Sequence, residues 1–428
     1  MQPAERLTAL FGRRRFAIKP GTERIKALLA RLGHPERALR AIHVVGTNGK
    51  GSTASFLTTI LKQAGHRTGL FTSPHLVRFN ERFRIDGGEV DDELLDRTVE
   101  RLLAQAHPDD TFFELTTALA CLLFAEQGVD LAILEAGMGG RADATAAVTA
   151  QATLLTPISR DHTQWLGENC AAIAAEKVAI VEAGTPLICA PQQPAVMAVV
   201  EQHCASNANR LILAERDFSI SVGDPDGYRY HGLSHQLDRL MPGIQGSYQR
   251  WNLATALAAA ELLDEQGISV PATALRDGIA AAHWPGRMER FQQPGHAEIL
   301  LDGAHNPSGA QALAEALQSE TRQGRLILLI GLMEDKEIDG VIAPLAALAH
   351  RIVSVAPQQE RALSAQKLAE RCRALGYAAE SGGTVAATLM QQLAASAPHD
   401  LLVVAGSLFV VGEARAALTG SACEAVRG

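Results

Sequence analysis

Residues Ile42–Ser52 read IHVVGTNGKGS, and this stretch decides the fold. Its first part, Ile42 to Val45, is a short apolar run that predicts a buried strand. A glycine loop follows, and glycines allow backbone N–H groups to turn towards a phosphate at close range. The helix expected over residues 53–64 points the positive end of its dipole at the same place. The stretch therefore predicts a strand, a phosphate-binding loop and a helix, the first unit of an α/β fold.

Two side chains of the loop fit a nucleotide. Lys50 can reach the outer phosphates, and the hydroxyl of Ser52 can bind Mg²⁺. The spacing between the glycines is two residues shorter than in the GxxxxGK[ST] pattern, so this is not an ordinary Walker A loop. The alternative is a glycine turn beside a chance lysine, and the flanking strand and helix favour phosphate binding over it.

The composition argues against several classes of protein. A net charge of −8 argues against a nucleic-acid surface, which would favour a basic patch. The sequence has no apolar run of about 18 residues and no signal-peptide layout at its start, so we expect no contact with a membrane. The six cysteines are scattered without a CxxC pair, which indicates buried thiols in a reducing compartment. We therefore expect a cytoplasmic protein.

Strand and helix patterns alternate twice along the 428 residues. The segment His283–Arg287, HWPGR, interrupts the first series with Pro-Gly, and we place a domain boundary there. Residues 1–284 are expected to form a P-loop-containing domain with a mostly parallel sheet, and residues 285–428 a smaller Rossmann-like α/β domain. The strands expected in the second domain are 297–301, 325–330, 351–355, one near 378, and 400–404.

Polar residues follow several strands of the first domain, at the edge where doubly wound sheets bind ligands. Glu135 ends one strand, where it could bind Mg²⁺ or pair with Arg141. His162 follows the next, where a neutral imidazole could bind a metal or hydrogen-bond within its loop. On composition alone, Lys177 reads as a surface charge, because a lysine amine is protonated near neutral pH. Arg82 belongs either to a clamp for an anionic substrate or to the solvent face of a strand.

Nine motifs in the same order resemble the bacterial dihydrofolate synthase/folylpolyglutamate synthase family of the Mur ligase superfamily. They cover nearly the whole chain up to about Glu413 and read GTNGKGS, TSPHLVRFNER, LEAGMGGRADAT, DHTQWLG, AAEKVAI, WNLATAL, WPGR, LDGAHNP and GSLFVVGE. The resemblance implies an ATP-dependent amide ligase. In such enzymes a pteroate or folate carboxylate attacks the γ-phosphate of ATP, and the amine of L-glutamate then displaces phosphate from the acyl phosphate. Closure of the smaller domain would keep water from the intermediate.

The resemblance also implies the residues that bind ATP and metal. Two Mg²⁺ ions are expected, one at Ser52, Ser73 and Glu135, the other at Glu135, His162 and Lys177. The matching family lysine is carbamylated, which turns an ammonium into an anionic oxygen ligand. Lys177, His162 and His305 take catalytic roles, and K⁺ is a further candidate cofactor. The residues expected at ATP are Thr47, Asn48, Gly49, Lys50, Gly51, Ser52, Asn252, Arg287 and Asp302.

A pterin pocket and a glutamate site complete the set. Phe113 could stack on the flat ring, a contact of roughly 1 kcal/mol, or Phe112 and Phe113 could both belong to the core. His305 and Ser407 are the candidates for the glutamate or acyl-phosphate end. The pterin candidates are Lys19, Pro20, Gly21, Thr22, Arg82, Thr111, Phe112, Phe113, Glu114, Ala142, Asp143 and Ala144.

The chain departs from the family's pattern in three motifs, and these departures bear on details of the pterin pocket rather than on the phosphate or metal sites. EKVAI stands for EKAGI, ADATA for LDATN, and Arg160 for a small apolar residue before Asp161. The alternatives are folylpolyglutamate synthesis alone, another Mur-type ligase, a P-loop phosphotransferase and an inactive ATP-sensing protein. Only 45 residues precede Gly46, fewer than the extra N-terminal domain of muramyl ligases would need. The resemblance implies a monomer that acts on small molecules.

Overall fold

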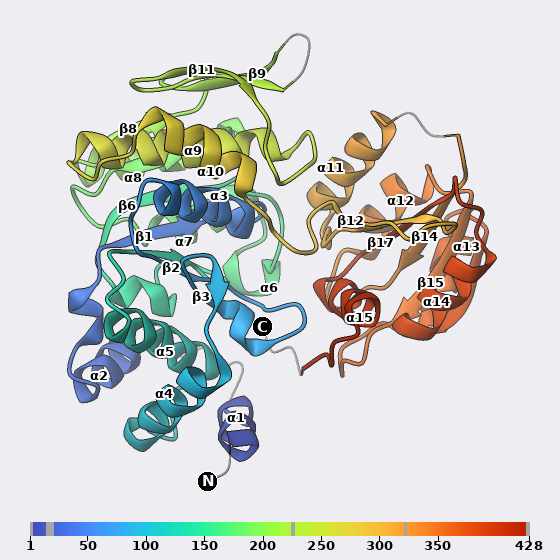
Figure 1. Ribbon diagram of the computed structural model, residues 1–428, viewed down its shortest axis with the longest axis horizontal. Coiled ribbons are helices and arrows are strands. Elements are labelled where there is room, and N and C mark those ends of the chain that lie inside the picture. Colours follow the sequence, from blue (N-terminus) through green and yellow to red (C-terminus); the bar gives the residue numbers. More distant parts are fainter. Residues whose placement is uncertain (1–2, 14–20, 224–226, 321–322, 425–428) are drawn as a thin grey trace.

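Two sheets of unequal size, each covered by helices, form two lobes (Figure 1). The computed structural model describes residues 3–13, 21–223, 227–320 and 323–424. The larger lobe runs from blue to yellow in Figure 1 and the smaller lobe from orange to red. The expected α/β class, with a larger and mostly parallel sheet followed by a smaller one, is confirmed.

The sheet of the large lobe has eight strands in the order β4-β3-β2-β5-β1-β6-β7-β8. Neighbouring strands from β2 to β8 are parallel, whereas β3 and β4 add an antiparallel edge. Successive side chains of a strand point to opposite faces, and every residue of β5 is buried because helices cover both faces. The strands are β1 (Ala41–Val45), β2 (Thr68–Phe71), β3 (Phe83–Ile85), β4 (Gly88–Glu89), β5 (Leu131–Glu135), β6 (Ala150–Leu155), β7 (Leu187–Cys189) and β8 (Leu211–Leu213).

Helices cover the two faces of this sheet. The first face carries α3 (Lys50–Gln63), α9 (Gln249–Glu265) and α10 (Ala272–Ala281). Here Gly278 is required for packing, since a Cβ on it would lie 2.4 Å from the Cα of Ile60 in α3. The second face carries α1 (Pro3–Phe11), α2 (Glu23–Arg31), α4 (Asp92–Gln105), α5 (Phe112–Glu126), α7 (Cys170–Val178) and α8 (Pro194–Ser206). Short helical turns are η1 (Pro35–Ala38), η2 (Phe79–Arg82), η3 (Ala144–Ala147) and α6 (Thr163–Leu166).

A small antiparallel sheet lies over α9 at the top of Figure 1. Its strands are β9 (Ser219–Val222), β10 (Tyr228–His231) and β11 (Gln236–Leu240). The buried carboxylate of Glu261 on α9 holds it in place by accepting hydrogen bonds from Tyr230 Oη at 2.7 Å, Leu233 N at 2.8 Å and His235 N at 2.7 Å. Such complete pairing is what a carboxylate needs when it is removed from water.

The sheet of the small lobe has six strands in the order β12-β13-β17-β14-β15-β16, all parallel except the edge strand β12. The strands are β12 (Glu289–Phe291), β13 (Glu298–Leu301), β14 (Leu326–Ile330), β15 (Arg351–Ala356), β16 (Ala379–Thr384) and β17 (Leu401–Ala405). The helices are α11 (Pro307–Gln318), α12 (Ile338–Ala346), α13 (Ala365–Ala374), α14 (Val385–Ala395) and α15 (Leu408–Thr419).

The loop after β2 ties the two lobes together. Leu76 and Val77 belong to the hydrophobic cluster of the small lobe, although β2 belongs to the large one. The segment after α15 returns to the same loop, where Glu424 N donates to Val77 O and Phe79 N donates to the Glu424 carboxylate, both at 2.8 Å. The loop also carries Ser73, so the contact between the lobes lies close to a predicted metal ligand.

Several expectations need correction. Helix α3 begins at Lys50 rather than 53, so Lys50 to Ser52 lie in its first turn. The solvent-face alternative for Arg82 is wrong, because this side chain is fully buried and its Nε lies 2.9 Å from His75 Nδ1. The antiparallel β12 and helix α15 were missed.

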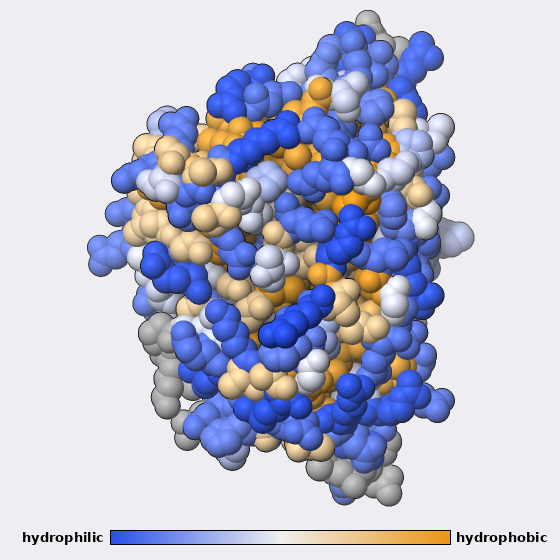
Figure 2. All heavy atoms as spheres, turned by 90° about the vertical axis from the view of Figure 1, so that its left-hand side faces the viewer, coloured by the Kyte–Doolittle hydropathy of each residue, from blue (hydrophilic) through white to orange (hydrophobic). Residues whose placement is uncertain are grey.

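The surface of the large lobe that faces away from the small one is mostly hydrophilic, with apolar side chains showing between the polar ones (Figure 2). Within the described parts of the chain, none of the helices combines the length and the apolar character that crossing a membrane requires.

Candidate active site between the lobes

The carboxyl ends of β1, β5 and β6 face the carboxyl end of β13 across a cleft between the lobes. The cleft encloses a cavity of about 530 Å³. Fourteen of the residues expected at ATP, metal or glutamate contribute to its lining: Thr47, Asn48, Gly49, Lys50, Gly51, Ser52, Ser73, Glu135, His162, Lys177, Asn252, Arg287, Asp302 and His305.

The glycine loop is shaped by its neighbours. Gly46 and Gly49 have φ values of 148° and 88°, which side chains disfavour, and a Cβ on Gly49 would lie 2.2 Å from Asn252 Oδ1. The amides of Thr47 and Asn48 donate to Pro157 O at 3.1 and 3.2 Å, so they hold the loop onto the end of β6. The N–H groups of the first turn of α3 therefore remain as the donors best placed for a phosphate, because they have no partner within a helix.

Lys50, Ser52 and Glu135 form a polar cluster beside the loop, in which Ser52 and Glu135 are buried and Lys50 is partly buried. Lys50 Nζ lies 3.9 Å from Glu135 Oε1, and Ser73 N donates to Glu135 Oε2 at 3.3 Å. Burial raises the pKa of Glu135, and Lys50 opposes this rise. The hydroxyl of Ser52 is buried and makes no hydrogen bond within the described chain. The unsatisfied hydroxyl and the buried carboxylate both offer oxygen atoms that a divalent cation could bind.

Lys177 is not a surface charge, so the expectation from composition alone is wrong. The residue is 4% exposed, and Nζ donates to Met138 O at 2.7 Å. Burial, together with nearby Lys50, lowers the pKa of Lys177 to about 7. A large share of this amine is therefore uncharged at neutral pH and able to react with CO₂.

His162 lies at the mouth of the same cluster. Burial lowers the pKa of His162 to about 4, so the imidazole is neutral near pH 7 and suited to bind a metal. In the described residues, no three His, Cys, Asp or Glu side chains assemble into a metal site. The predicted sets combine Glu135 and His162 with Ser and Lys, and Ser52 and Lys177 fit a cation through the unpaired hydroxyl and the lowered pKa. The alternative that Glu135 pairs with Arg141 is wrong, since Arg141 lies 3.8 Å from Glu176.

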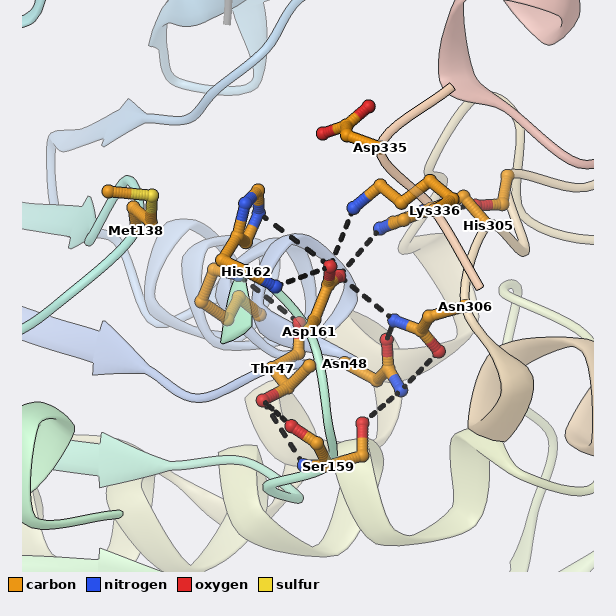
Figure 3. A network of polar contacts seen from close by, with 12 residues as sticks. Thr47, Asn48, Met138, Ser159, Asp161, His162, His305, Asn306, Asp335 and Lys336 are labelled. Carbon is orange, nitrogen blue, oxygen red and sulfur yellow. Dashed lines mark hydrogen bonds and ion pairs between the residues drawn. The ribbon is translucent and has the colours of Figure 1, made fainter. Parts of the chain in front are cut away.

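Asp161 joins the lobes next to this cluster (Figure 3). Lys336 Nζ lies 2.6 Å from Oδ1, and His305 Nε2 and Asn306 Nδ2 lie 3.3 and 3.2 Å from Oδ2. Burial alone would raise the pKa of Asp161, but His305 and Lys336 hold it well below its ordinary value. Asn306 also exchanges amide hydrogen bonds with Asn48 at 2.9 and 3.2 Å.

Sequence reasoning missed Asp161, Asn306 and Lys336 as site residues. Asp161 and Asn306 stand directly beside the predicted residues His162 and His305, and their position after a strand was the available signal. Lys336 follows β14 by a longer loop, and nothing in its surroundings in the sequence separates it from a surface lysine.

The carboxylate of Asp302 holds the segment through which the chain passes into the small lobe. Tyr248 Oη donates to Asp302 Oδ2 at 2.7 Å, while Met288 N and Ala304 N donate to the same carboxylate at 3.0 Å each. Arg287, which follows the Pro-Gly break, approaches Gly303 so closely that a Cβ there would lie 1.8 Å from Nη1. Asp302 and Arg287 thus bring the connection between the lobes to the rim of the cleft.

The predicted glutamate residues are placed differently. His305 Nδ1 lies 2.8 Å from Gly303 O, and its ring faces the cleft and Asp161. Ser407 is 2% exposed and caps α15, accepting from Phe409 N at 3.2 Å. Leu408, the next residue, lines the cavity whereas Ser407 does not.

The pterin candidates gather between α2, α5 and η3. Thr111 and Glu114 form a capping box at the start of α5, and Glu114 pairs with Arg24 at 2.9 Å. Asp143 is buried and accepts four hydrogen bonds, from Gly137 N, Met138 N, Thr145 N and Thr145 Oγ1. Gly21 and Thr22 precede α2, Ala142 is exposed and Ala144 buried, and Lys19 and Pro20 lie outside the described residues.

The two phenylalanines differ. Phe112 is 3% exposed and packs against the guanidinium of Arg82 at 5.2 Å, so for Phe112 the core alternative is correct. Phe113 is only partly buried, and its ring lies against Gly137, where a Cβ would come within 2.6 Å. Since Gly137 lines the cavity, Phe113 lies directly behind its wall.

Comparisons with known proteins agree with this geometry. The Mur ligase middle domain matches residues 44–203, and the Mur ligase glutamate ligase domain matches residues 286–408. The dihydrofolate synthase/folylpolyglutamate synthase of Bacillus subtilis is 37% identical over 358 residues, which cover 80% of this chain and 82% of that protein. This chain belongs to the dihydrofolate synthase/folylpolyglutamate synthase family. It is accordingly an ATP-dependent ligase that forms carbon–nitrogen bonds between an acid and an amino acid.

Solved structures of the family have the same fold. Escherichia coli FolC in complex with DHPP and ADP has a TM-score of 0.88 at 31% identity, with 98% of each chain covered. A bifunctional folylpolyglutamate synthase/dihydrofolate synthase with Mn, AMPPNP and L-glutamate bound has a TM-score of 0.87 at 30% identity, also with 98% of each chain covered. ATP is therefore a co-substrate of this family, and a divalent metal ion accompanies it.

Proposed function

We propose that the enzyme joins L-glutamate both to dihydropteroate and to the γ-carboxylate of folates. The observation that carries this proposal is the buried cluster of Ser52, Glu135 and Lys177 beside the glycine loop, at the floor of a cleft that both lobes line. The bifunctional relatives and their complexes with DHPP and with L-glutamate support the choice of substrates.

The proposed reaction has two displacements. The substrate carboxylate attacks the γ-phosphorus of ATP, which gives an acyl phosphate and releases ADP. The amine of L-glutamate then attacks the acyl carbon, phosphate leaves with the electron pair of the C–O bond, and the amine loses a proton. Lys50 and the N-terminus of α3 stabilise negative charge on the phosphates in the first step. The docked small lobe keeps water away from the acyl phosphate, which hydrolysis would waste.

The proposed metal residues would hold two Mg²⁺ ions. Ser52, Ser73 and Glu135 would hold the first, and Glu135, His162 and carbamylated Lys177 the second. When bound, Mg²⁺ neutralises phosphate oxygens and brings two anionic reactants together. The lowered pKa of Lys177 supports carbamylation, because only the uncharged amine adds to CO₂, with release of one proton. K⁺ is a further proposed cofactor, to which no residue is assigned.

The remaining proposed sites bind ATP, the pterin ring and glutamate. Asn252, Arg287 and Asp302 are proposed to contact ATP, and Phe113 with Asp143 to shape the pterin pocket. His305 is proposed to act on the glutamate or acyl-phosphate end, and its place in the lining of the cleft supports this role. Ser407 is proposed for the same end, but it is buried and does not line the cavity. We also propose a domain boundary after residue 284, a monomer and a cytoplasmic location.

An assay with defined substrates tests this function. Purified enzyme with dihydropteroate, ATP and L-glutamate should yield dihydrofolate and ADP in equal amounts, and tetrahydrofolate should gain glutamate residues. If tetrahydrofolate is extended but dihydrofolate is not formed, the enzyme has only the folylpolyglutamate synthase activity. Phosphorylated product without an amide bond would contradict the proposal.

A further inference from the structure

Lys336 is a charged residue at the lobe interface to which the proposed function gives no role. Lys336 lies between β14 and α12 of the small lobe, and 12% of its side chain is exposed. Its Nζ lies 2.6 Å from Oδ1 of Asp161, which belongs to the large lobe. The ammonium therefore crosses the interface rather than facing solvent, where lysine usually lies.

Asp161 connects this cation with His162 (Figure 3). The oxygen that meets Lys336 also accepts the backbone N–H of His162 at 2.9 Å, and the Nε2 atom of His162 lies 4.0 Å away. The other oxygen is occupied by His305 and Asn306. Both oxygens of Asp161 thus contact residues of the small lobe, and one of them also accepts the backbone N–H of His162.

His162 needs such support. Its φ is 51°, in the left-handed region that residues other than glycine rarely adopt. Its carbonyl accepts the backbone N–H groups of Trp165 at 2.9 Å and Leu166 at 3.0 Å at the start of the short helix α6, which anchors the backbone of His162 but not its imidazole. The carboxylate of Asp161, 4.0 Å from Nε2, is therefore a charged neighbour that can help to position the imidazole.

We propose that Lys336 is a positioning residue. It holds Asp161, and through it His162, in the geometry that binds the second proposed divalent ion, the one assigned to Glu135, His162 and Lys177. Docking of the small lobe thereby raises the affinity of the large lobe for that ion. The inference rests on the proposed role of His162 as a metal ligand. Carboxylates behind a metal-binding histidine commonly change metal affinity by 10- to 100-fold, so an effect of about tenfold is expected.

Binding of Mn²⁺ in the presence of AMPPNP, followed by electron paramagnetic resonance, tests this role. Lys336→Met should weaken Mn²⁺ binding about tenfold, and Lys336→Arg should restore most of it because a guanidinium can also pair with Asp161. Asp335→Asn is the matched control, since it removes a charge from the neighbouring residue, which is exposed and pairs with Arg361 instead. This control should bind Mn²⁺ like the unaltered enzyme.

Two further variants separate the possible failures. His162→Ala should weaken Mn²⁺ binding; if it does and Lys336→Met does not, the inference is wrong while the proposed metal site stands. If His162→Ala has no effect, both are wrong. Because Lys336→Met could act through folding, Asp161→Asn is combined with it: losses that do not add support coupling through the pair, and fully additive losses overturn it.

Discussion

Glu135 and Glu261 are both buried glutamates of the large lobe, yet their surroundings differ. Glu261 accepts hydrogen bonds at 3.0 Å or less from Tyr230 Oη, Leu233 N and His235 N. Among the described residues, Glu135 accepts one long hydrogen bond, from Ser73 N at 3.3 Å, and Lys50 Nζ lies 3.9 Å from its carboxylate. Both side chains are removed from water, so the contrast lies in how far the protein itself satisfies them.

This difference separates a group that holds the fold from a group that awaits a ligand. A buried carboxylate without adequate partners lowers stability, and it persists where function requires it. The same contrast holds between Asp161, whose oxygens are all occupied, and the Ser52 hydroxyl, which makes no hydrogen bond in the described chain. We therefore predict that the buried polar groups with few hydrogen-bond partners in the protein bind the metal and the nucleotide.

The largest effect is expected at Lys177. Lys177→Ala should lower the ligation rate by about 100-fold or more, because the enzyme loses a metal-binding carbamate. The melting temperature should stay within a few degrees. Glu176→Ala is the control, since this neighbour on α7 is 41% exposed in its side chain. Near-normal turnover of Lys177→Ala would remove the lysine from the metal site.

Glu135→Gln should be nearly as harmful to ligation, yet should not destabilise the ligand-free protein. Burial raises the pKa of Glu135, so its ionised form opposes folding at neutral pH, and this cost vanishes below the ordinary pKa near 4.5. The variant should therefore melt at or above the temperature of the unaltered enzyme at pH 7, with the difference shrinking as the pH falls towards 4.5. A clearly lower melting temperature at pH 7 would break the comparison with Glu261.

Glu261→Gln should show the opposite pattern. The new amide turns a donor towards the N–H groups that the carboxylate accepts, which should lower the free energy of unfolding by about 2 kcal/mol. Thermal or urea unfolding measures this loss. The ligation rate at a temperature where the variant is folded should be unchanged, because Glu261 lies under the small antiparallel sheet; a large loss of activity would contradict its structural role.

The smallest effect is the gradual change in carbamylation of Lys177 with pH. Because the pKa of Lys177 is about 7, the uncharged amine becomes more abundant as the pH rises from 6 to 8, and the carbamate should follow. With ¹³C-labelled bicarbonate, a carbamate signal should grow over this range, and activity of enzyme depleted of CO₂ should return on adding bicarbonate. A signal that persists in Lys177→Ala would show that it arises elsewhere.

The regular part of the fold could be predicted from the sequence. Strands β13, β14, β15 and β17 lie within one residue of the expected boundaries, because continuous apolar runs between turn residues leave little choice. Strand β12 was missed because three residues at a sheet edge have too short a pattern, and α15 because the motif GSLFVVGE reads equally as an apolar strand. Arg82 was ambiguous because its alternation with Phe83 says nothing of what later covers the strand.

The site was predictable where ligand-binding residues follow strands or lie within motifs. Glu135, His162 and the glycine loop do meet in one cleft. The partners of Asp161 could not be found in this way, because 175 residues separate it from Lys336 and only the docking of two lobes brings them together. The lowered pKa of Lys177 was also invisible, since it results from burial.

The most direct test of the metal and nucleotide cleft is diffraction from crystals grown with AMPPNP and Mn²⁺, with the anomalous signal of manganese recorded. We predict that the triphosphate lies along residues 46–52 and that a manganese peak stands beside Glu135 within reach of His162. A triphosphate bound outside the cleft, or no manganese near Glu135, would contradict the account.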